Sequence, residues 1–418
     1  CITKATSFTC IFAAMTRWIF FLIFFLLSSF YASQALRTLQ IGRWVLPTYW
    51  LICAATLAFI YYQLSNEISV ENEFFRTYAI GAYIMLFVFQ SFLVLFLFSE
   101  DIFRIVRAII SFFNPDMGPV WASRRKFVSQ LALGVAAVPT LGLLYGIFKG
   151  KYNYKVLRYT LTFDDLPDAF DGFQIAQVSD FHCGSFDNRA RVQYGIDLVN
   201  KQEADVIVFT GDIVNNRAVE LEPWKKILGT LSAKNGVYSV LGNHDYGDYY
   251  PWDSEAAKAD NLTDLVRLQK EMGYQLLRNE HAILEKEGSH LAIVGVENWG
   301  TGGFKKAGDL NAALSGLDQK AFKILLSHDP SHWQVEVKEG NVRIPLTLSG
   351  HTHGMQFGIE IPGLIKWSPV KWRYPYWAGV YKENNRFLNV NRGFGFLAYP
   401  GRFGIWPEIS VITLKKSV

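Results

Sequence analysis

Histidine, aspartate and asparagine residues recur directly after short apolar runs in the second half of the chain. Side chains of these types bind metal ions and move protons. Five apolar runs each deliver such a cluster: Asp180 and His182 after Phe173–Val178, Asp212 after Val206–Thr210, Asn243, His244 and Asp245 after Val237–Leu241, His328 after Lys323–Ser327, and His351 and His353 after Ile344–Ser349.

These clusters predict a metal centre. Ligands of open α/β sheets bind beyond the carboxyl ends of the strands, so the five clusters are expected to converge. Imidazole, carboxylate and amide donors without a thiolate favour Mn, Fe or Zn. The donors are too numerous for one ion. Two divalent ions about 3.5–4 Å apart are the arrangement that supports displacement at a phosphoester.

The elements that position these residues are predicted to be alternating strands and helices. A sixth apolar run, Leu291–Val296, joins the five above, and amphipathic stretches such as Arg189–Gln202 and Ser254–Met272 lie between runs. This alternation predicts one layered α/β domain over residues 161–418. The glycines before Asp212, Asn243 and His351 are expected to allow tight turns between strand and site.

The first part of the chain predicts a membrane region over residues 15–150. Four windows without charged residues lie near 18–36, 44–66, 77–99 and 127–148. A bilayer core takes roughly 20 apolar residues in a helix. Met15, just before the first window, is a candidate for the native start.

Loop charges predict on which side the domain lies. Basic residues follow the first window (Arg37, Arg43) and the third (Arg104, Arg107, Arg124, Arg125, Lys126), whereas Glu67, Glu71 and Glu73 follow the second. Basic loops face the cytoplasm, so the catalytic domain is expected outside a bacterial inner membrane. Arg124-Arg125 before a mild apolar stretch also resembles a twin-arginine export signal, which would make that machinery a partner. The alternative is a plain basic cluster before a helix.

Composition excludes several classes. The chain has 418 residues, of which half are apolar and 19% are charged. Residues 1–150 carry 11 Lys and Arg against 6 Asp and Glu, and residues 151–418 carry 30 against 31. A nearly neutral second part gives no basic patch for nucleic acid. The four scattered cysteines form neither a disulfide framework nor a metal knuckle.

The order of the clusters resembles the calcineurin-like metallophosphoesterase superfamily. Asp180-Phe181-His182, Gly211-Asp212, Gly242 to Asp245, His328 and Gly350 to His353 match its motifs. The helical region, the twin-arginine-like leader and the tail near Gly401–Ile409 are similar to its membrane-tethered bacterial branch. The resemblance implies an α/β fold, a four-layer αββα metallophosphoesterase sandwich, preceded here by an α-helical membrane region of about four spans.

The resemblance also implies roles for single residues. Asp180, His182, Asp212 and His353 would hold the first metal. Asp212 would bridge to the second, which Asn243, His328 and His351 would complete. His244 would face the substrate, where it would either bind the phosphoryl group or protonate the leaving oxygen, and Asp245 would orient His244.

The expected function is hydrolysis of a phosphomonoester, phosphodiester or pyrophosphate bond by attack of a metal-bridging hydroxide. Membrane anchoring favours a lipid-linked or cell-envelope substrate, with membrane lipids as partners. Basic and aromatic residues at 366–377 suit an interface with anionic head groups, or else a loop packed on the domain. Two alternatives remain: a UDP-diacylglucosamine pyrophosphatase-type enzyme of lipid A synthesis, and a catalytically silent membrane sensor or scaffold.

Overall fold

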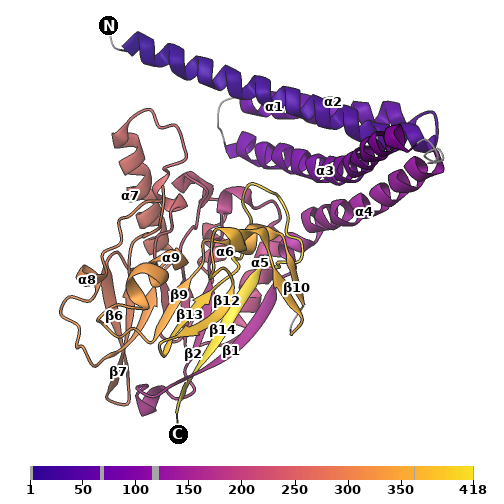
Figure 1. Ribbon diagram of the computed structural model, residues 1–418. Helices are drawn as coiled ribbons and strands as arrows, with labels where there is room; N and C mark the ends of the chain where they lie inside the picture. The colour runs from indigo at the N-terminus through magenta and orange to yellow at the C-terminus, as the bar shows by residue number, and fades with distance from the viewer. Residues whose placement is uncertain (1–2, 66–69, 115–121, 362, 418) are drawn as a thin grey trace. The chain divides into compact units, whose positions relative to one another are not determined.

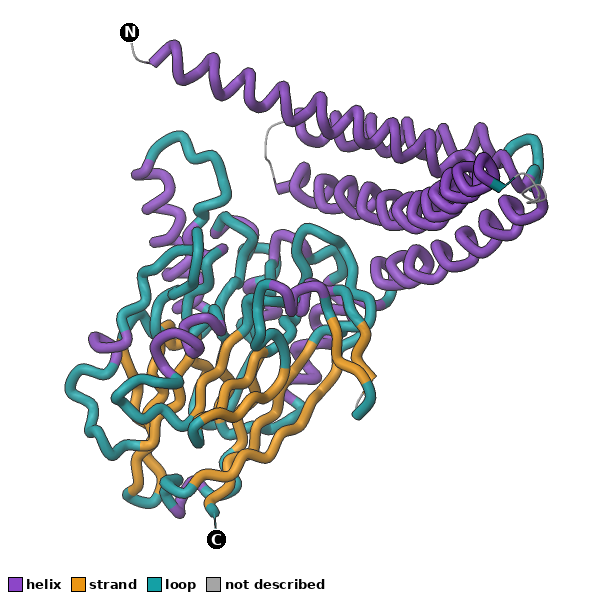
Figure 2. The backbone as a smooth tube through the Cα atoms, viewed as in Figure 1, coloured by secondary structure: helices purple, strands orange, loops and turns teal. Residues whose placement is uncertain are grey.

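The computed structural model describes all residues except 1–2, 66–69, 115–121, 362 and 418. The described residues of 1–67 and 78–144 form one compact unit, and those of 68–77 and 145–418 form a second. The first unit is helical, and the strands lie in the second (Figure 1, Figure 2).

Four long helices make up the membrane region: α1 (Thr3–Leu39), α2 (Val45–Ser65), α3 (Val70–Phe113) and α4 (Ala122–Phe148). Each contains a segment long and apolar enough to cross a bilayer, at Ile19–Leu39, Val45–Gln63, Phe75–Phe113 and Ser123–Phe148. Large apolar side chains such as Phe20, Leu51 and Val138 are more than two-thirds exposed. A surface of this kind suits lipid rather than water.

Polar contacts inside the bundle join the helices. The Gln90 amide of α3 donates to Ser29 Oγ of α1 at 2.9 Å and to Tyr49 Oη of α2 at 3.0 Å. Hydrogen bonds of this kind fix the packing of apolar helices, whose surfaces alone specify little.

The paired arginines at the start of α4 bind acidic residues of α3. Arg125 lies 2.6 Å from Asp101 and 3.1 Å from Glu100, and the Arg124 guanidinium covers the Phe103 ring at 3.3 Å. Glu67 lies outside the described residues, as do the side chains of Glu71 and Glu73. The described ion pairs therefore give the arginine pair a structural role in the bundle.

The second unit contains two six-stranded mixed sheets. The first has the order β1 (Lys155–Phe163), β14 (Glu408–Lys416), β2 (Gln174–Val178), β3 (Val206–Phe209), β4 (Val237–Ser239) and β5 (Tyr274–Leu276). The second has the order β12 (Gly379–Glu383), β13 (Arg386–Val390), β9 (Leu346–Ser349), β8 (Phe322–Leu326), β7 (Ser289–Gly295) and β6 (Glu280–Lys286). A separate hairpin pairs β10 (Ile359–Ile361) with β11 (Ile365–Trp367).

The sheets pack face to face, with helices on the two outer faces. Val206 of β3 and Ile324 of β8 lie in the core between the sheets. Their neighbours Ile207 and Leu325 point to the opposite faces, into separate outer cores. Strands buried on both faces consist of unbroken apolar runs, so they can be recognised in the sequence.

The outer helices are short or amphipathic. On the first sheet lie α5 (Arg189–Asn200), α6 (Lys225–Leu228) and α7 (Glu255–Glu271), and on the second lie α8 (Leu310–Ala313) and α9 (Pro330–His332), which continues into a π-helical turn at Trp333–Val337. The predicted four-layer αββα architecture, preceded by four apolar helices, is confirmed.

Candidate active site

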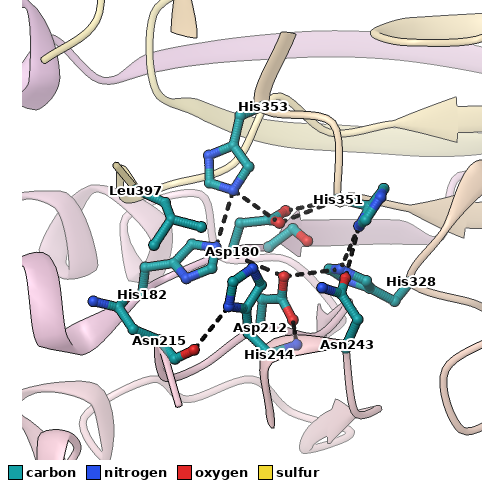
Figure 3. A network of polar contacts seen from close by, with 12 residues as sticks. Asp180, His182, Asp212, Asn215, Asn243, His244, His328, His351, His353 and Leu397 are labelled. Atoms are coloured by element: carbon teal, nitrogen blue, oxygen red, sulfur yellow. Dashed lines mark hydrogen bonds and ion pairs between the residues drawn. The ribbon is translucent and has the colours of Figure 1, made fainter. Parts of the chain in front are cut away.

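Two groups of side chains that could hold a metal ion meet where the strands of both sheets end (Figure 3). In the first group, donor atoms of Asp180, His182 and His353 all lie within 4.8 Å of one another. The Nε2 atoms of His182 and His353 are 3.0 Å apart, and His353 Nε2 is 3.2 Å from Asp180 Oδ1. Asp180 and His182 follow β2, and His353 follows β9, so the two sheets build this group together.

The second group contains Asp212, His328 and His351. His328 Nε2 lies 3.0 Å from Asp212 Oδ2, and His351 Nδ1 lies 2.8 Å from Asn243 Oδ1. Asp212 Oδ2 is also 3.6 Å from His182 Nε2 of the first group. Asp212 therefore lies between the two groups, as a bridging ligand must, and all seven predicted donors are brought together.

The backbone at these residues is unusual. Asp180, His182, Asp212, His351 and His353 all have positive φ, between 49° and 72°. Residues other than glycine rarely adopt this left-handed conformation, which costs of order 1–3 kcal/mol at each position. Such strain gathers where function fixes a side-chain direction, and here it turns donors from separate strands toward one region.

Close approach explains two of the motif glycines. A Cβ on Gly350 would lie 2.4 Å from Asp180 Oδ2, and one on Gly242 would lie 2.2 Å from Asp212 Oδ1. The expected tight turn is seen before Asp212, where Gly211 has φ 94°. At Gly242 and Gly350, the glycine instead leaves room for a carboxylate.

Hydrogen bonds to the second ring nitrogen orient the His328 and His351 rings. His328 Nδ1 lies 2.7 Å from the Thr210 carbonyl oxygen, which leaves Nε2 to face Asp212. His351 Nε2 lies 2.8 Å from the Tyr374 hydroxyl, which leaves Nδ1 to face Asn243. Partners of this kind fix the tautomer of a ligating imidazole.

Asp245 does not play the predicted role of holding the His244 ring. The His244 Nδ1 atom lies 2.7 Å from the Asn215 carbonyl oxygen instead. The buried Asp245 carboxylate accepts backbone N–H groups of Gly242, Asp212 and Ile213 at 2.8–2.9 Å. Asp245 therefore ties together the two turns that carry Asp212 and Asn243, because its carboxylate accepts N–H groups from both.

The charges of the site favour a cation. Burial raises the pKa of Asp180, but His353 and His328 lower it more, so its pKa lies well below the usual range. Burial likewise opposes ionisation of Asp212, but His328 and His244 hold its pKa well below the usual value. These carboxylates are charged at neutral pH.

The histidine pKa values differ within the site. Burial, followed by His353, holds the pKa of His182 well below its ordinary value, and burial lowers the pKa of His351. Burial also lowers the pKa of His328, but Asp212 outweighs it and raises the value to about 10. Neutral imidazoles and charged carboxylates are the forms that bind divalent ions. His182, His351 and the two carboxylates have these forms already, and an ion beside Asp212 would displace the proton that Asp212 holds on His328. With this proton released, the donor set fits two such ions.

A cavity of about 430 Å³ opens over the two groups. His244, Asp212 and His351 line it on one side. Apolar and aromatic side chains also line it, together with one cation: Phe304, Met355, Val370, Trp372, Leu397 and Arg373. A phosphoryl group and an adjoining apolar group can therefore be held side by side.

The basic and aromatic stretch at 366–377 divides into two parts. Tyr374 and Trp377 are buried and pack on the domain, whereas Lys371, Trp372 and Arg373 are exposed. The packed loop is therefore confirmed for Tyr374 and Trp377, and the interface with head groups stays a prediction for the exposed residues.

Three contributors lie outside the predicted set. Asn215 holds His244, Tyr374 orients His351, and Arg402 Nη2 lies 3.2 Å from His353 Nδ1. Asn215 acts through its backbone carbonyl oxygen, so its residue type gave no signal. Tyr374 and Arg402 reach the site from distant segments and leave no local signal.

The other histidines and Cys183 lie elsewhere. His332 contacts Ser327 and Glu336, His281 contacts the Ala313 carbonyl oxygen, and His290 is exposed. Cys183 is buried in the core beneath α5 and α6.

Comparison with known proteins agrees with this geometry. Residues 173–355 match the calcineurin-like phosphoesterase family, and residues 16–151 match a family described as a probable calcineurin-like phosphoesterase transmembrane domain. The uncharacterized metallophosphoesterase YkuE of Bacillus subtilis is 32% identical over 302 residues, which cover 71% of this chain and 98% of that protein.

Two further relatives have the same domain. A transmembrane protein with metallophosphoesterase domain from Danio rerio is 28% identical over 295 residues, 69% of this chain and 62% of that protein. An uncharacterized metallophosphoesterase of Aquifex aeolicus is 26% identical over 268 residues, 63% of this chain and 93% of that protein.

Proposed function

We propose that this protein uses two divalent ions to hydrolyse lipid-linked phosphoesters or pyrophosphates. The chain belongs to the calcineurin-like metallophosphoesterases and is therefore a metal-dependent phosphoesterase. The observation that carries the proposal is the pair of buried donor groups with Asp212 between them. Membrane association is supported by the four candidate spans and by the match to a transmembrane family.

Each group would hold one ion. Asp180, His182 and His353 would bind the first, His328, His351 and Asn243 the second, and Asp212 both. Mn, Fe and Zn suit this mixture of imidazole, carboxylate and amide donors. When bound, two such ions supply an activated water at neutral pH and neutralise charge on the phosphoryl oxygens.

His244 is proposed as the general acid. Because a carbonyl oxygen only accepts, the bond to Asn215 requires the proton on Nδ1 and leaves Nε2 for the substrate. His244 lines the cavity beside Asp212, and its backbone N–H donates to Asp212 Oδ1 at 2.8 Å. In the imidazolium form Nε2 also carries a proton. Transfer of this proton to the leaving oxygen would assist departure of a poor leaving group and leave a neutral ring that keeps its Nδ1 proton on the Asn215 carbonyl oxygen.

The apolar lining and the membrane region support a lipid-linked substrate. Purified full chain with added Mn should hydrolyse a lipid monophosphate or lipid pyrophosphate with higher kcat/KM than glycerol phosphate, whose organic group offers no apolar contact. Equal rates on the two kinds of substrate would contradict lipid selectivity. Absence of turnover on every phosphoester tested would instead favour a sensor or scaffold.

The catalytic domain is proposed to lie outside a bacterial inner membrane, reached through the twin-arginine machinery. Support comes from the basic loops and from Arg124-Arg125. In spheroplasts of a bacterial host, an added protease that cannot cross the membrane should digest the domain. Full protection would contradict the external location.

The ion pairs of the arginines permit a matched control for this route. Changing both arginines to lysine keeps the charge opposite Glu100 and Asp101 but removes the export motif. This double variant should become protease-protected. Asp101→Asn weakens the ion pair and leaves the motif intact, so it should remain accessible. If the double lysine variant stayed accessible and Asp101→Asn became protected, the arginines would serve helix packing alone.

A further inference from the structure

The β10–β11 hairpin has the reverse of the polarity expected for a water-exposed hairpin. Ile359 pairs with Trp367, Glu360 with Lys366, and Ile361 with Ile365. Residues that pair directly in an antiparallel ladder lie on the same face. One face therefore carries the apolar pairs, and the other carries the charged pair.

Both residues of the charged pair contact the domain, although Lys366 is itself exposed. Glu360 lies 2.6 Å from Arg392, whose side chain is buried, and the Lys366 ammonium contacts the Ala378 carbonyl oxygen. Lys366 Nζ also lies 5.2 Å from the Trp377 ring centre. These contacts fix the orientation of the hairpin.

The apolar face is exposed. Ile359, Ile361 and Ile365 are 47%, 49% and 42% exposed, and Leu364 at the turn is 79% exposed. A soluble hairpin normally packs its apolar face inward and shows its charges to water. Here the sequence exposes four large aliphatic side chains together, which points to an apolar partner.

The exposed face continues to the mouth of the active-site cavity. Trp372, which is 77% exposed, has its ring 6.2 Å from that of Trp367 on the hairpin. Trp372 and Met355 also line the cavity. Lys371 and Arg373 flank Trp372 and are both exposed.

We propose that this surface, formed by Ile359, Ile361, Leu364, Ile365 and Trp372, inserts into the interfacial layer of an anionic bilayer. Aliphatic side chains at a tip, a tryptophan behind them and flanking cations are the combination that binds such interfaces. The four candidate spans tether the chain to a bilayer, which raises the effective concentration of lipid at the hairpin. This inference rests on the proposed function: a lipid-linked substrate would enter the cavity directly from the bilayer.

A labelling experiment tests the contact without relying on activity. Leu364→Cys and, as control, Glu287→Cys in the exposed β6–β7 turn are labelled with the fluorophore NBD in the full chain. In nanodiscs with anionic lipid, dithionite should reduce NBD at 287 quickly and NBD at 364 at least several-fold more slowly. In amphipol, which provides no bilayer, the two rates should become similar.

Equal rates in nanodiscs would overturn the proposal. Protection of position 364 in amphipol as well would also overturn it, because the surface would then be covered by protein.

A kinetic experiment tests the consequence for substrate entry. Leu364→Glu should lower kcat/KM roughly tenfold or more for a lipid phosphate held in anionic vesicles, by the loss of buried apolar area. Hydrolysis of a soluble aryl phosphoester should be unchanged. Ile283→Glu on β6, which replaces another exposed aliphatic residue (42% exposed) outside this surface, should change neither rate.

Equal losses on both substrates would show that the hairpin supports the active site itself, and would contradict bilayer entry. If wild-type protein hydrolyses neither substrate, the proposed function fails, while the labelling rates still decide the bilayer contact.

Discussion

Asp212→Asn is expected to lower phosphoesterase activity by roughly 10³-fold or more, because it removes the charge shared by both metal groups. Asp212 Oδ2 faces His328 at 3.0 Å and His182 at 3.6 Å, so one carboxylate serves both groups. An amide is neutral and bridges two cations poorly. Turnover of an aryl phosphoester by purified variant and wild type measures the loss.

Asp171→Asn is the matched control, since that carboxylate pairs with Lys415 at the protein surface. It should keep full activity. Near-normal turnover by Asp212→Asn would mean that Asp212 does not bridge, and the pairing of the two groups would have to be abandoned.

His244→Ala is expected to keep near-normal metal content and to lose about 10²–10⁴-fold in rate on alkyl phosphoesters, whose leaving groups need a proton. On an aryl phosphoester the loss should be much smaller, because that leaving group departs without protonation. The ratio of the two losses, together with metal analysis of the same sample, measures the role.

His281→Ala provides the control, as its ring contacts the Ala313 carbonyl oxygen away from the site. A His244→Ala protein that has lost metal would identify His244 as a ligand. Equal losses on alkyl and aryl substrates would identify it as a phosphate-binding group.

The strands and the convergence of the candidate metal ligands were predictable because both leave local patterns. Strands such as β3 and β8 are buried on both faces, so each reads as an apolar run that ends at a polar residue. Asp212 and His328 follow these runs directly. Parallel neighbours end at one edge of a sheet, which brings residues distant in sequence together.

Contacts made through tertiary packing were not predictable in the same way. Tyr374 reaches His351, and Arg402 reaches His353, only after their segments fold back over the sheet ends. The role of Asp245 depends on which backbone N–H groups its carboxylate meets, and a motif does not show this. Asn215 acts through its carbonyl oxygen, which every residue has, so its side-chain type gave no signal.

Amino-acid composition did not show how the hairpin is oriented or which residues pair with the two arginines. Basic and aromatic residues at 366–377 suggested an interface, but only the β10–β11 register shows which face is apolar and exposed. The ion pairs of Arg124-Arg125 with Glu100 and Asp101 were not predictable, because these acidic residues lie more than 20 positions away, on another helix. Ion pairs between helices have no sequence spacing of their own.

The central claim is that two ions share Asp212, and metal analysis of the purified full chain tests it most directly. Wild-type protein of full activity should contain two divalent ions per chain, and Asp212→Asn should contain clearly fewer at the same free metal concentration. Full activity with one ion per chain would contradict the dinuclear site.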